Sequence, residues 1–395
     1  MKVSPYSRAG LWRFLHHPQQ IWIRRINFQV HLWVGIVLAL YLMLIGVSGS
    51  ILVLRIELGA LSGANPWESR KAPEPRADIT EVVRNLTTHY PGFRIVSVAA
   101  PGKTEATYIA RLWGRTQIRV GVDAETGEVL GVVKRGPAWL DTMEKLHVSL
   151  FASRNGRILN GVGAAFLLAM CVTGLINWWP GVRNWKRALK VDFGRSWRRI
   201  NFDLHSATGF WTLAIISFWA VSGVYFAWPR EIFAFVNRIS PIVNSKPPTV
   251  EVTARSEMSE PDLDGLVKRA YALDPGTTFA GVEFPFNRRA PIKILMRRGN
   301  GLSREYEDTL YFDPYTTAHL ATWRYGVNQS LGDWFIWSQV PLHFGVYWGL
   351  GVKIIWAVLG LAVPALAVTG LLMYWNRTLR KKWERLRAEP QIPPA

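Results

Sequence analysis

The chain has 395 residues, 49% of them hydrophobic, and a formal net charge of +19 at pH 7. Three short segments, residues 1–30, 180–202 and 376–395, carry +5, +6 and +4 of that charge, and they flank long uncharged runs. Charge placed in this way is typical of the cytoplasmic side of a membrane protein, so it gives no reason to expect a nucleic-acid partner. The only cysteine, Cys171, excludes an internal disulfide and a cluster of thiolate metal ligands.

Four uncharged apolar runs are predicted to be transmembrane helices. They cover about Leu32–Leu54, Ile158–Trp179, Leu204–Trp228 and Ile354–Trp375. Each has the roughly 20 apolar residues that a helix needs to cross the hydrocarbon core of a bilayer. The first run ends at Arg55 without a convincing cleavage site, so we expect it to be retained and not removed as a signal peptide. With four spans, the three basic segments and both termini lie in the cytoplasm.

The two longer segments between the spans are predicted to be small α+β modules on the outer side of the membrane. The first has a helix with amphipathic spacing and then alternating strands, at Asp78–Tyr90, Phe93–Ala99, Ala106–Leu112 and Gln117–Val122. The second repeats this order at Leu263–Ala272, Thr278–Glu283, Ile292–Arg297 and a strand pair around Tyr311–Thr316. Matching Asp-x-x-Thr turns, Asp123 to Thr126 and Asp313 to Thr316, indicate two copies of one module.

The membrane part also repeats. The segment Arg24–His31 (Arg-Arg-Ile-Asn-Phe-Gln-Val-His) returns 174 residues later as Arg198–His205, followed in both copies by a Gly and a Val-Ser-Gly triplet (Gly35, Val47–Gly49; Gly209, Val221–Gly223). A second pair of runs repeats with an offset of 196, through Leu146-His147, Thr173–Leu175 and Trp179, and then Leu342-His343, Thr369–Leu371 and Trp375. Each of the four spans therefore begins or ends beside one histidine. Such placement near hydrocarbon is costly and favours a functional role.

The predicted fold class is an α-helical integral membrane protein with four transmembrane helices from an internal duplication and two periplasmic α+β modules. Its predicted segments are a basic N-terminus at 1–26, spans at 27–55, 141–180, 203–229 and 336–376, modules at 56–140 and 230–335, a basic loop at 181–202 and a tail at 377–395.

The four matched histidines predict two heme b groups. Bis-histidine ligation needs two imidazoles from different helices at one depth, and duplication places equivalent residues at equivalent depth. We therefore expect His31 to pair with His205 near the cytoplasmic side and His147 with His343 on the outer side. Without a Cys-x-x-Cys-His motif, both hemes are held non-covalently, and Gly35 and Gly209 leave room for a porphyrin one turn from the inner pair. Zinc is the main alternative, and a single interfacial histidine can also be an anchor.

Other residues near the histidines are candidates for contacts with heme or with an electron acceptor. Arg157 and Lys353 each follow their histidine by ten residues, and they could neutralise the outer heme's propionates or simply snorkel at the interface. On a continuous helix this spacing is about 15 Å, which predicts an outer heme at or above the membrane surface. Trp334 and Trp337 are candidates for an acceptor site, with an aromatic belt as the alternative. Arginines beside the inner pair could serve its heme, although positive-inside bias explains them too: Arg24, Arg25, Arg198 and Arg199.

These motifs resemble the family of bacterial inner-membrane proteins that have PepSY domains and PepSY-associated transmembrane helices. The likeness covers about Arg24 to Trp375 and rests on the two Arg-Arg-Ile-Asn-Phe-x-x-His segments, the Leu-His and Thr-Gly-Leu spans and the two Asp-x-x-Thr hairpins. Within the family the chain is most similar to ferric-siderophore reductases, such as the ferrioxamine and pyoverdine reductases. This resemblance implies an inner-membrane location, periplasmic modules and a ferric siderophore as the electron acceptor.

We therefore expect a membrane oxidoreductase: a diheme b-type electron-transfer protein that reduces ferric siderophore in the periplasm and releases ferrous iron for uptake. The sequence has no Gly-rich strand-to-helix turn for a flavin or nicotinamide, so the expected donor is a membrane quinol or a membrane redox partner. Electron transfer assigns no catalytic acid or base. The alternative is a non-enzymatic PepSY membrane protein that binds or regulates a periplasmic partner or assists a transporter.

Overall fold

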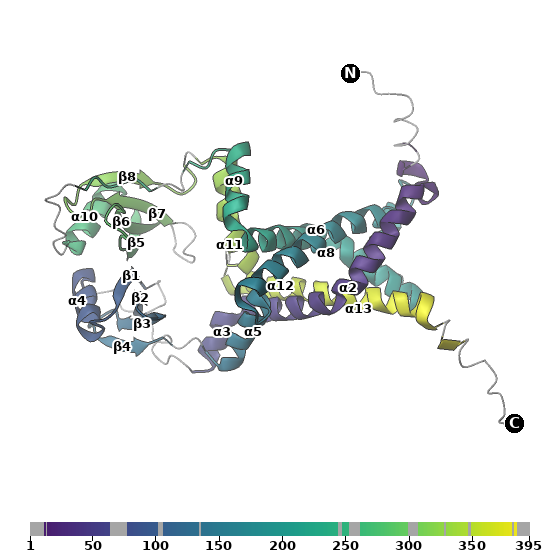
Figure 1. Ribbon diagram of the computed structural model, residues 1–395, viewed down its shortest axis with the longest axis horizontal. Helices are drawn as coiled ribbons and strands as arrows, with labels where there is room; N and C mark the ends of the chain where they lie inside the picture. The colour runs from purple at the N-terminus through teal and green to yellow at the C-terminus, as the bar shows by residue number, and fades with distance from the viewer. Residues whose placement is uncertain are drawn as a thin grey trace, which may run out of the picture. The chain divides into compact units, whose positions relative to one another are not determined.

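The computed structural model describes residues 12, 14–63, 77–101, 106–133, 136–243, 247–252, 261–298, 307–327, 329–346, 349–380 and 383–384. The chain divides into two compact units, which Figure 1 shows as a set of long helices and a sheet with shorter helices. The helical unit takes residues 1–54, 142–232 and 353–395, and the sheet unit takes residues 55–141 and 233–352.

The helical unit is built from four apolar helical segments. They are α2 (Trp22–Val53), α6 (Ser153–Trp178), α8 (Trp197–Ala227) and a last segment over Gly349–Leu379, which is formed by α12 (Gly349–Gly360), α13 (Ala362–Tyr374) and the π-helix η3 (Trp375–Leu379). Within the described residues these four segments are long and apolar enough to cross a membrane. The four spans predicted from the sequence are therefore present as helices.

These helices pack as a bundle in which α2 and α8 each contact both α6 and α13. Small residues let the backbones come close: a methyl group on Gly46 of α2 would lie 2.5 Å from Pro364 Cδ and 3.2 Å from Val363 Cβ, both on α13. Close approach through small residues is the usual packing mode between helices in a membrane. The short helices η1 (Pro18–Gln20) and α7 (Trp185–Ala188) complete the unit.

A helix ends shortly after each of the outer histidines, His147 and His343. Helix α5 (Ala138–Ser149) stops before α6, and Leu150, Phe151 and Ser153 have φ values of 46°, 60° and 48°. Helix α11 (Leu331–Phe344) ends at Gly345, which has a left-handed conformation with φ of 65°. The expectation of a continuous helix from His147 to Arg157 and from His343 to Lys353 is therefore wrong, because positive φ angles turn the chain out of the helix. The spacing of about 15 Å along one helix axis no longer applies.

The sheet unit holds one antiparallel sheet with the strand order β4-β3-β2-β1-β5-β6-β7-β8. Its strands are β1 (Arg94–Ala99), β2 (Thr107–Trp113), β3 (Gln117–Asp123), β4 (Val129–Val132), β5 (Thr277–Glu283), β6 (Ile292–Arg298), β7 (Glu307–Phe312) and β8 (His319–Trp323). The two predicted modules are thus joined edge to edge, since Ser97, Val98 and Ala99 of β1 pair with Glu283, Val282 and Gly281 of β5. This pairing was not foreseen from the sequence.

Two amphipathic helices cover one face of this sheet, α4 (Ile79–His89) and α10 (Leu263–Leu273). Their fully buried side chains, among them Val82, Leu86 and Leu266, join the inward-facing strand residues in one core. Each such side chain contributes about 1.5–3 kcal/mol by leaving water. The Asp264 carboxylate of α10 accepts hydrogen bonds from the backbone N–H groups of Ile79 (3.0 Å) and Thr80 (3.3 Å) and so caps α4. The two modules therefore share both a sheet and a helix cap.

The predicted Asp-x-x-Thr turns have the same geometry in both places. Asp123 Oδ1 accepts from the backbone N–H of Glu125 (2.9 Å) and Thr126 (3.0 Å), and Asp313 Oδ1 accepts from Tyr315 (2.7 Å) and Thr316 (3.0 Å). The remaining described helices are α3 (Arg55–Leu61) and α9 (Pro229–Ile239). An ion pair of 2.6 Å joins Arg55 to Asp141 of α5.

Candidate functional site

The structure brings the rings of His31 of α2 and His205 of α8 together in a T-shaped arrangement. Their ring centroids are 6.4 Å apart and their planes are almost perpendicular, at 86°. Because α2 and α8 lie on opposite sides of α6 and α13, the two imidazoles meet in the middle of the bundle. The repeat predicts that His31 and His205 lie at the same depth, and in the structure their rings are close neighbours.

A threonine fixes the orientation of each imidazole. His31 Nδ1 lies 2.9 Å from Thr173 Oγ1, and His205 Nδ1 lies 2.9 Å from Thr369 Oγ1. The two hydroxyl protons are already used, because Thr173 donates to the Ala169 carbonyl and Thr369 to the Ala365 carbonyl. Each hydroxyl oxygen must then accept from Nδ1–H, so the lone pair of each imidazole is on Nε2. This is the tautomer that a metal-ligating histidine needs.

The glycine after each threonine makes room for the ring it holds. A methyl group on Gly174 would lie 3.2 Å from His31 Cε1, and one on Gly370 would lie 3.4 Å from His205 Cε1. The repeated Thr-Gly-Leu motif, which in the sequence marks the duplication, also has a structural role, because its Thr and Gly hold the histidine of the neighbouring helix. The signal for this role was present in the sequence: two Thr-Gly pairs at matched depth in spans next to two histidines.

The two histidines line a cavity of about 380 Å³ between the helices. Its size is within the range of about 300–1,000 Å³ common for small-molecule and cofactor sites. Gly35 and Gly209, predicted to leave space for a porphyrin, both line it. Most of its other lining is apolar, either aliphatic or one of the following aromatic and sulfur-containing residues: Phe28, Met170, Cys171, Trp178, Phe202, Phe210, Met373 and Tyr374. Such a lining excludes water and suits a flat hydrophobic ligand.

The spacing of the pair fits ligation of one metal ion from two sides. Two imidazoles with metal–nitrogen bonds of about 2 Å, and about 1 Å from each nitrogen to its ring centre, have centroids about 6 Å apart. The observed 6.4 Å agrees with this value. Among the residues that the structure describes, no group of three or more His, Cys, Asp or Glu side chains is placed to hold a metal ion. The pair therefore fits heme, whose porphyrin supplies the remaining ligands, better than tetrahedral zinc.

His147 of α5 is also held in a metal-binding tautomer. Its Nδ1 lies 3.0 Å from the Ile45 carbonyl, which can only accept, so Nδ1 carries the proton and Nε2 the lone pair. Ser48 Oγ is 3.2 Å from the same nitrogen, and a methyl group on Gly49 would lie 2.7 Å from His147 Cε1. The Val-Ser-Gly triplet of α2 therefore forms the surface on which the His147 ring packs. Asn160 Nδ2 donates to the His147 carbonyl at 2.6 Å.

The predicted partner of His147 belongs to the other unit. His343 is near the end of α11 in the sheet unit, so the outer pair stays a prediction. Arg157 is exposed on α6, whereas Lys353 is buried on α12 with 9% of its surface accessible. Trp334 and Trp337 of α11 form an aromatic cluster with Tyr325, with ring centroids 4.8–5.6 Å apart.

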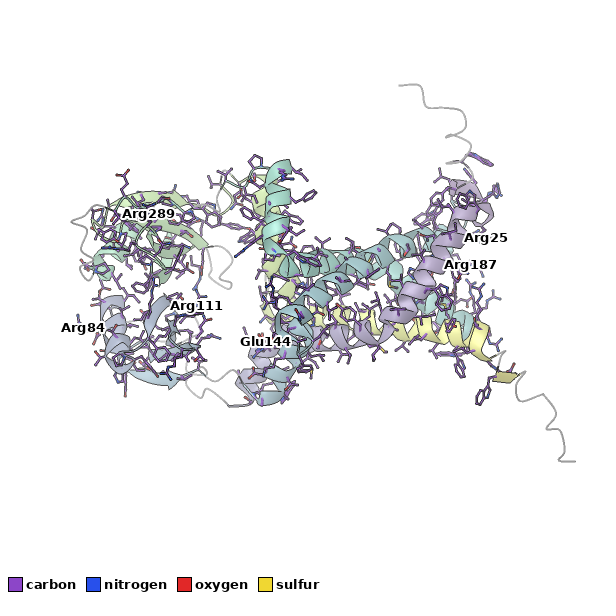
Figure 2. The ribbon with its side chains drawn as sticks, in the orientation of Figure 1. Arg25, Arg84, Arg111, Glu144, Arg187 and Arg289 are labelled. Atoms are coloured by element: carbon purple, nitrogen blue, oxygen red, sulfur yellow. The ribbon has the colours of Figure 1, made fainter. Side chains whose placement is uncertain are left out.

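Two of the arginines near the inner pair already have partners in the protein. Arg24 donates to the backbone carbonyls of Asn177 and Trp179 at the end of α6, and Arg199 forms a 2.9 Å ion pair with Asp203. Arg25 and Arg198 are exposed. Figure 2 shows Arg25 at the same end of the helical unit as Arg187 of α7, with Glu144 of α5 at the other end.

Comparison with known proteins places the whole membrane part in one family. A family model described as "PepSY-associated TM region" matches residues 28–377. A protein of Pseudomonas aeruginosa, named "Uncharacterized protein PA4219", is 26% identical over 266 residues. That match covers 60% of this chain and 64% of the relative, so the chain spans less than two thirds of the relative's length. The family model covers most of the chain, including the histidine-bearing helices α2 and α8 and the Thr-Gly-Leu helices α6 and α13. The chain therefore belongs to the family of proteins with a PepSY-associated TM region.

Proposed function

We propose that the chain is a diheme b-type membrane oxidoreductase that reduces a ferric siderophore in the periplasm and releases ferrous iron. The observation that carries the proposal is the His31–His205 pair, with centroids 6.4 Å apart and both Nε2 lone pairs available. Bound heme supplies one-electron redox chemistry at its iron. No protein acid or base is required, so the chain's task is to hold, orient and insulate the cofactors.

The residues around the inner pair fit that task. His31 and His205 would hold the heme iron, and Thr173 and Thr369 keep their rings in place through the Nδ1 hydrogen bonds. The largely apolar lining of the cavity would keep water away from the cofactor. For the outer heme we propose His147 and His343 as ligands, with Arg157 and Lys353 as candidates for neutralising its propionates. The tautomer of His147, fixed by the Ile45 carbonyl, supports its role as a ligand.

The placement in the cell follows from charge and is part of the same proposal. The three basic segments put both termini in the cytoplasm of a bacterial cell, and the sheet unit in the periplasm. A quinol in the inner membrane, or a membrane redox partner, would supply the electrons. A quinol gives two electrons and two protons, which is enough to reduce two ferric siderophores to the ferrous state. The weaker hold of siderophores on iron(II) then releases the metal.

The decisive experiment is a reduced-minus-oxidised spectrum of the purified full-length chain. We expect α-bands typical of bis-histidine heme b and about two hemes per chain. His89→Ala is the matched control for substitutions of the proposed ligand histidines. His89 is exposed on α4, and its Nδ1 forms a hydrogen bond with the carbonyl one turn earlier. A chain without a Soret band would overturn the proposal and favour the non-enzymatic alternative. If the dithionite-reduced protein carries heme but no ferric siderophore reoxidises it, the cofactor assignment stands and the substrate assignment fails.

A further inference from the structure

The inner cavity is symmetric in its ligands but not in its polar lining. Several equivalent lining residues are identical in the two copies. At the offset of 174 these are His31 and His205, and Phe28 and Phe202; at the offset of 196 they are Gly174 and Gly370. The symmetry fails at several positions, and at some of them only one copy has a hydrogen-bond donor, among them Ser206, Asn177 and Arg377. Asn177 of α6 corresponds to Met373, and Arg377 of η3 corresponds to Gly181. Asn177 and Arg377 both line the cavity. Duplication alone therefore does not explain these two donors.

Arg377 is placed by an irregular helix end. In the first copy α6 ends at Trp178, just before Pro180-Gly181, whereas the second copy continues as the π-helix η3, a rare form that is frequent at functional sites. This segment sets the Arg377 guanidinium 5.0 Å from the ring centroid of Phe28, another lining residue. Among the described residues, no carboxylate forms an ion pair with Arg377. Its charge is thus available to a ligand in the cavity.

Asn177 supplies a second donor without a partner. Its Oδ1 accepts a hydrogen bond from Asn27 Nδ2 at 2.9 Å. This bond determines which end of the Asn177 amide is oxygen, so the opposite end is the Nδ2 donor. That Nδ2 atom is buried, and within the part of the chain that the structure describes it has no hydrogen-bond partner. A buried donor left unsatisfied costs about 1–3 kcal/mol, so an acceptor on a bound ligand would recover this energy.

Both donors lie on the same side of the histidine pair. Asn177 follows Thr173 by four residues and Arg377 follows Thr369 by eight, which is about 6 Å and about 12 Å along the helix axes. The cavity lining contains no Asp or Glu. One rim of the cavity therefore offers an amide N–H and a guanidinium to an acceptor, while most of the remaining lining is apolar.

We propose that Arg377 and Asn177 form a carboxylate-binding subsite that holds a propionate of the inner heme and fixes the orientation of its macrocycle. This inference rests on the proposed function, because it takes heme as the occupant of the cavity. A planar guanidinium binds a carboxylate through two parallel hydrogen bonds, and the amide adds a third. Arg24 and Arg199, the alternatives on α2 and α8, are already engaged with carbonyls and with Asp203.

The test is a titration of the heme-depleted full-length chain with heme and with heme dimethyl ester, followed at the Soret band. Arg377→Met should weaken binding of heme about ten-fold, which corresponds to about 1.4 kcal/mol, and leave binding of the ester unchanged. Asn177→Leu should act in the same direction with a smaller effect, and Arg377→Lys should restore part of the loss. Arg380→Met is the matched control, since Arg380 is exposed and paired with Glu384 at 2.7 Å.

The outcomes distinguish a failure of the propionate subsite from a failure of the proposed heme function. Equal losses for heme and for the ester would mean that Arg377 supports only the fold of this end of the bundle, and the subsite would be refuted. No loss for either ligand would refute it as well. A wild-type chain that binds neither ligand would overturn the proposed function itself, and the subsite with it.

Discussion

Replacing the two threonines tests how the protein presents its inner histidines. In Thr173→Val the side chain keeps its shape but loses the oxygen that accepts from His31 Nδ1–H at 2.9 Å. Thr369→Val does the same to His205. Thr173→Ser and Thr369→Ser are the matched controls, because serine keeps the hydroxyl. All four variants leave the apolar lining of the cavity in place.

The expected size of the effect follows from the buried imidazole. A ring N–H without its acceptor costs about 1–3 kcal/mol, and the ring gains freedom to rotate or to move its proton to Nε2. Loss of the group that orients a ligating histidine typically lowers metal affinity about 10- to 100-fold. We expect each valine variant to lose heme within this range and the double variant to lose the inner heme almost entirely. The serine variants should stay close to the wild type.

The assay is the heme-to-protein ratio of the purified chain, with dissociation measured by transfer of heme to an excess of apomyoglobin. The α-bands are used to distinguish the proposed inner heme from the proposed outer heme. If the valine variants release heme no faster than the serine variants, the threonines do not set the tautomer, and the argument for available Nε2 lone pairs fails. If they affect the same spectral component as His147→Ala, the assignment of His31 and His205 to a separate heme fails.

Three other predictions concern pairing, topology and the sheet unit. His31→Ala and His205→Ala should each remove the same heme, and the double variant no more, whereas His147→Ala should spare it; heme content and α-bands of single and double variants check this. Reporter fusions at residues 110 and 290 should both report the periplasm, and a cytoplasmic signal from either would contradict the four-span topology. Arg298→Met should destabilise the sheet unit by about 2 kcal/mol in a thermal unfolding assay, since it deprives Asp274 and Asp308, with 2% and 0% of their side chains exposed, of a partner at 2.7 and 2.5 Å. Arg111→Met removes a partly exposed ion pair with Glu283 and a 2.7 Å hydrogen bond to Ser97, so it should cost less, about 1 kcal/mol.

Local sequence patterns were sufficient for the helices and strands. The amphipathic spacing of Asp78–Tyr90 gave α4 to within one residue at each end, and the alternation of Gln117–Val122 gave β3. Uncharged length alone gave the four long helices. These features are short-range, so the residues that form each element also contain its signal.

Features that depend on distant parts of the chain were not predictable in the same way. The pairing of β1 with β5 joins residues such as Val98 and Val282, and no local pattern specifies that edge. The break after α5 was missed for another reason. Leu150 and Phe151 adopt positive φ without a glycine at either position, so the usual sequence marker of a left-handed turn is absent.

The inner site shows why both repeat offsets are needed to understand this chain. His31 is held by Thr173 of the neighbouring helix α6, and His205 by Thr369 of α13. Each histidine is therefore oriented within its own half of the chain, yet the pair forms only where the two halves meet. Symmetry places the ligands, whereas Asn177 and Arg377, which break it, distinguish the two sides of the cavity. A cofactor bound by both histidines would link α2 to α8 through its metal. Loss of the cofactor should therefore loosen the contact between the halves before it disturbs either half alone.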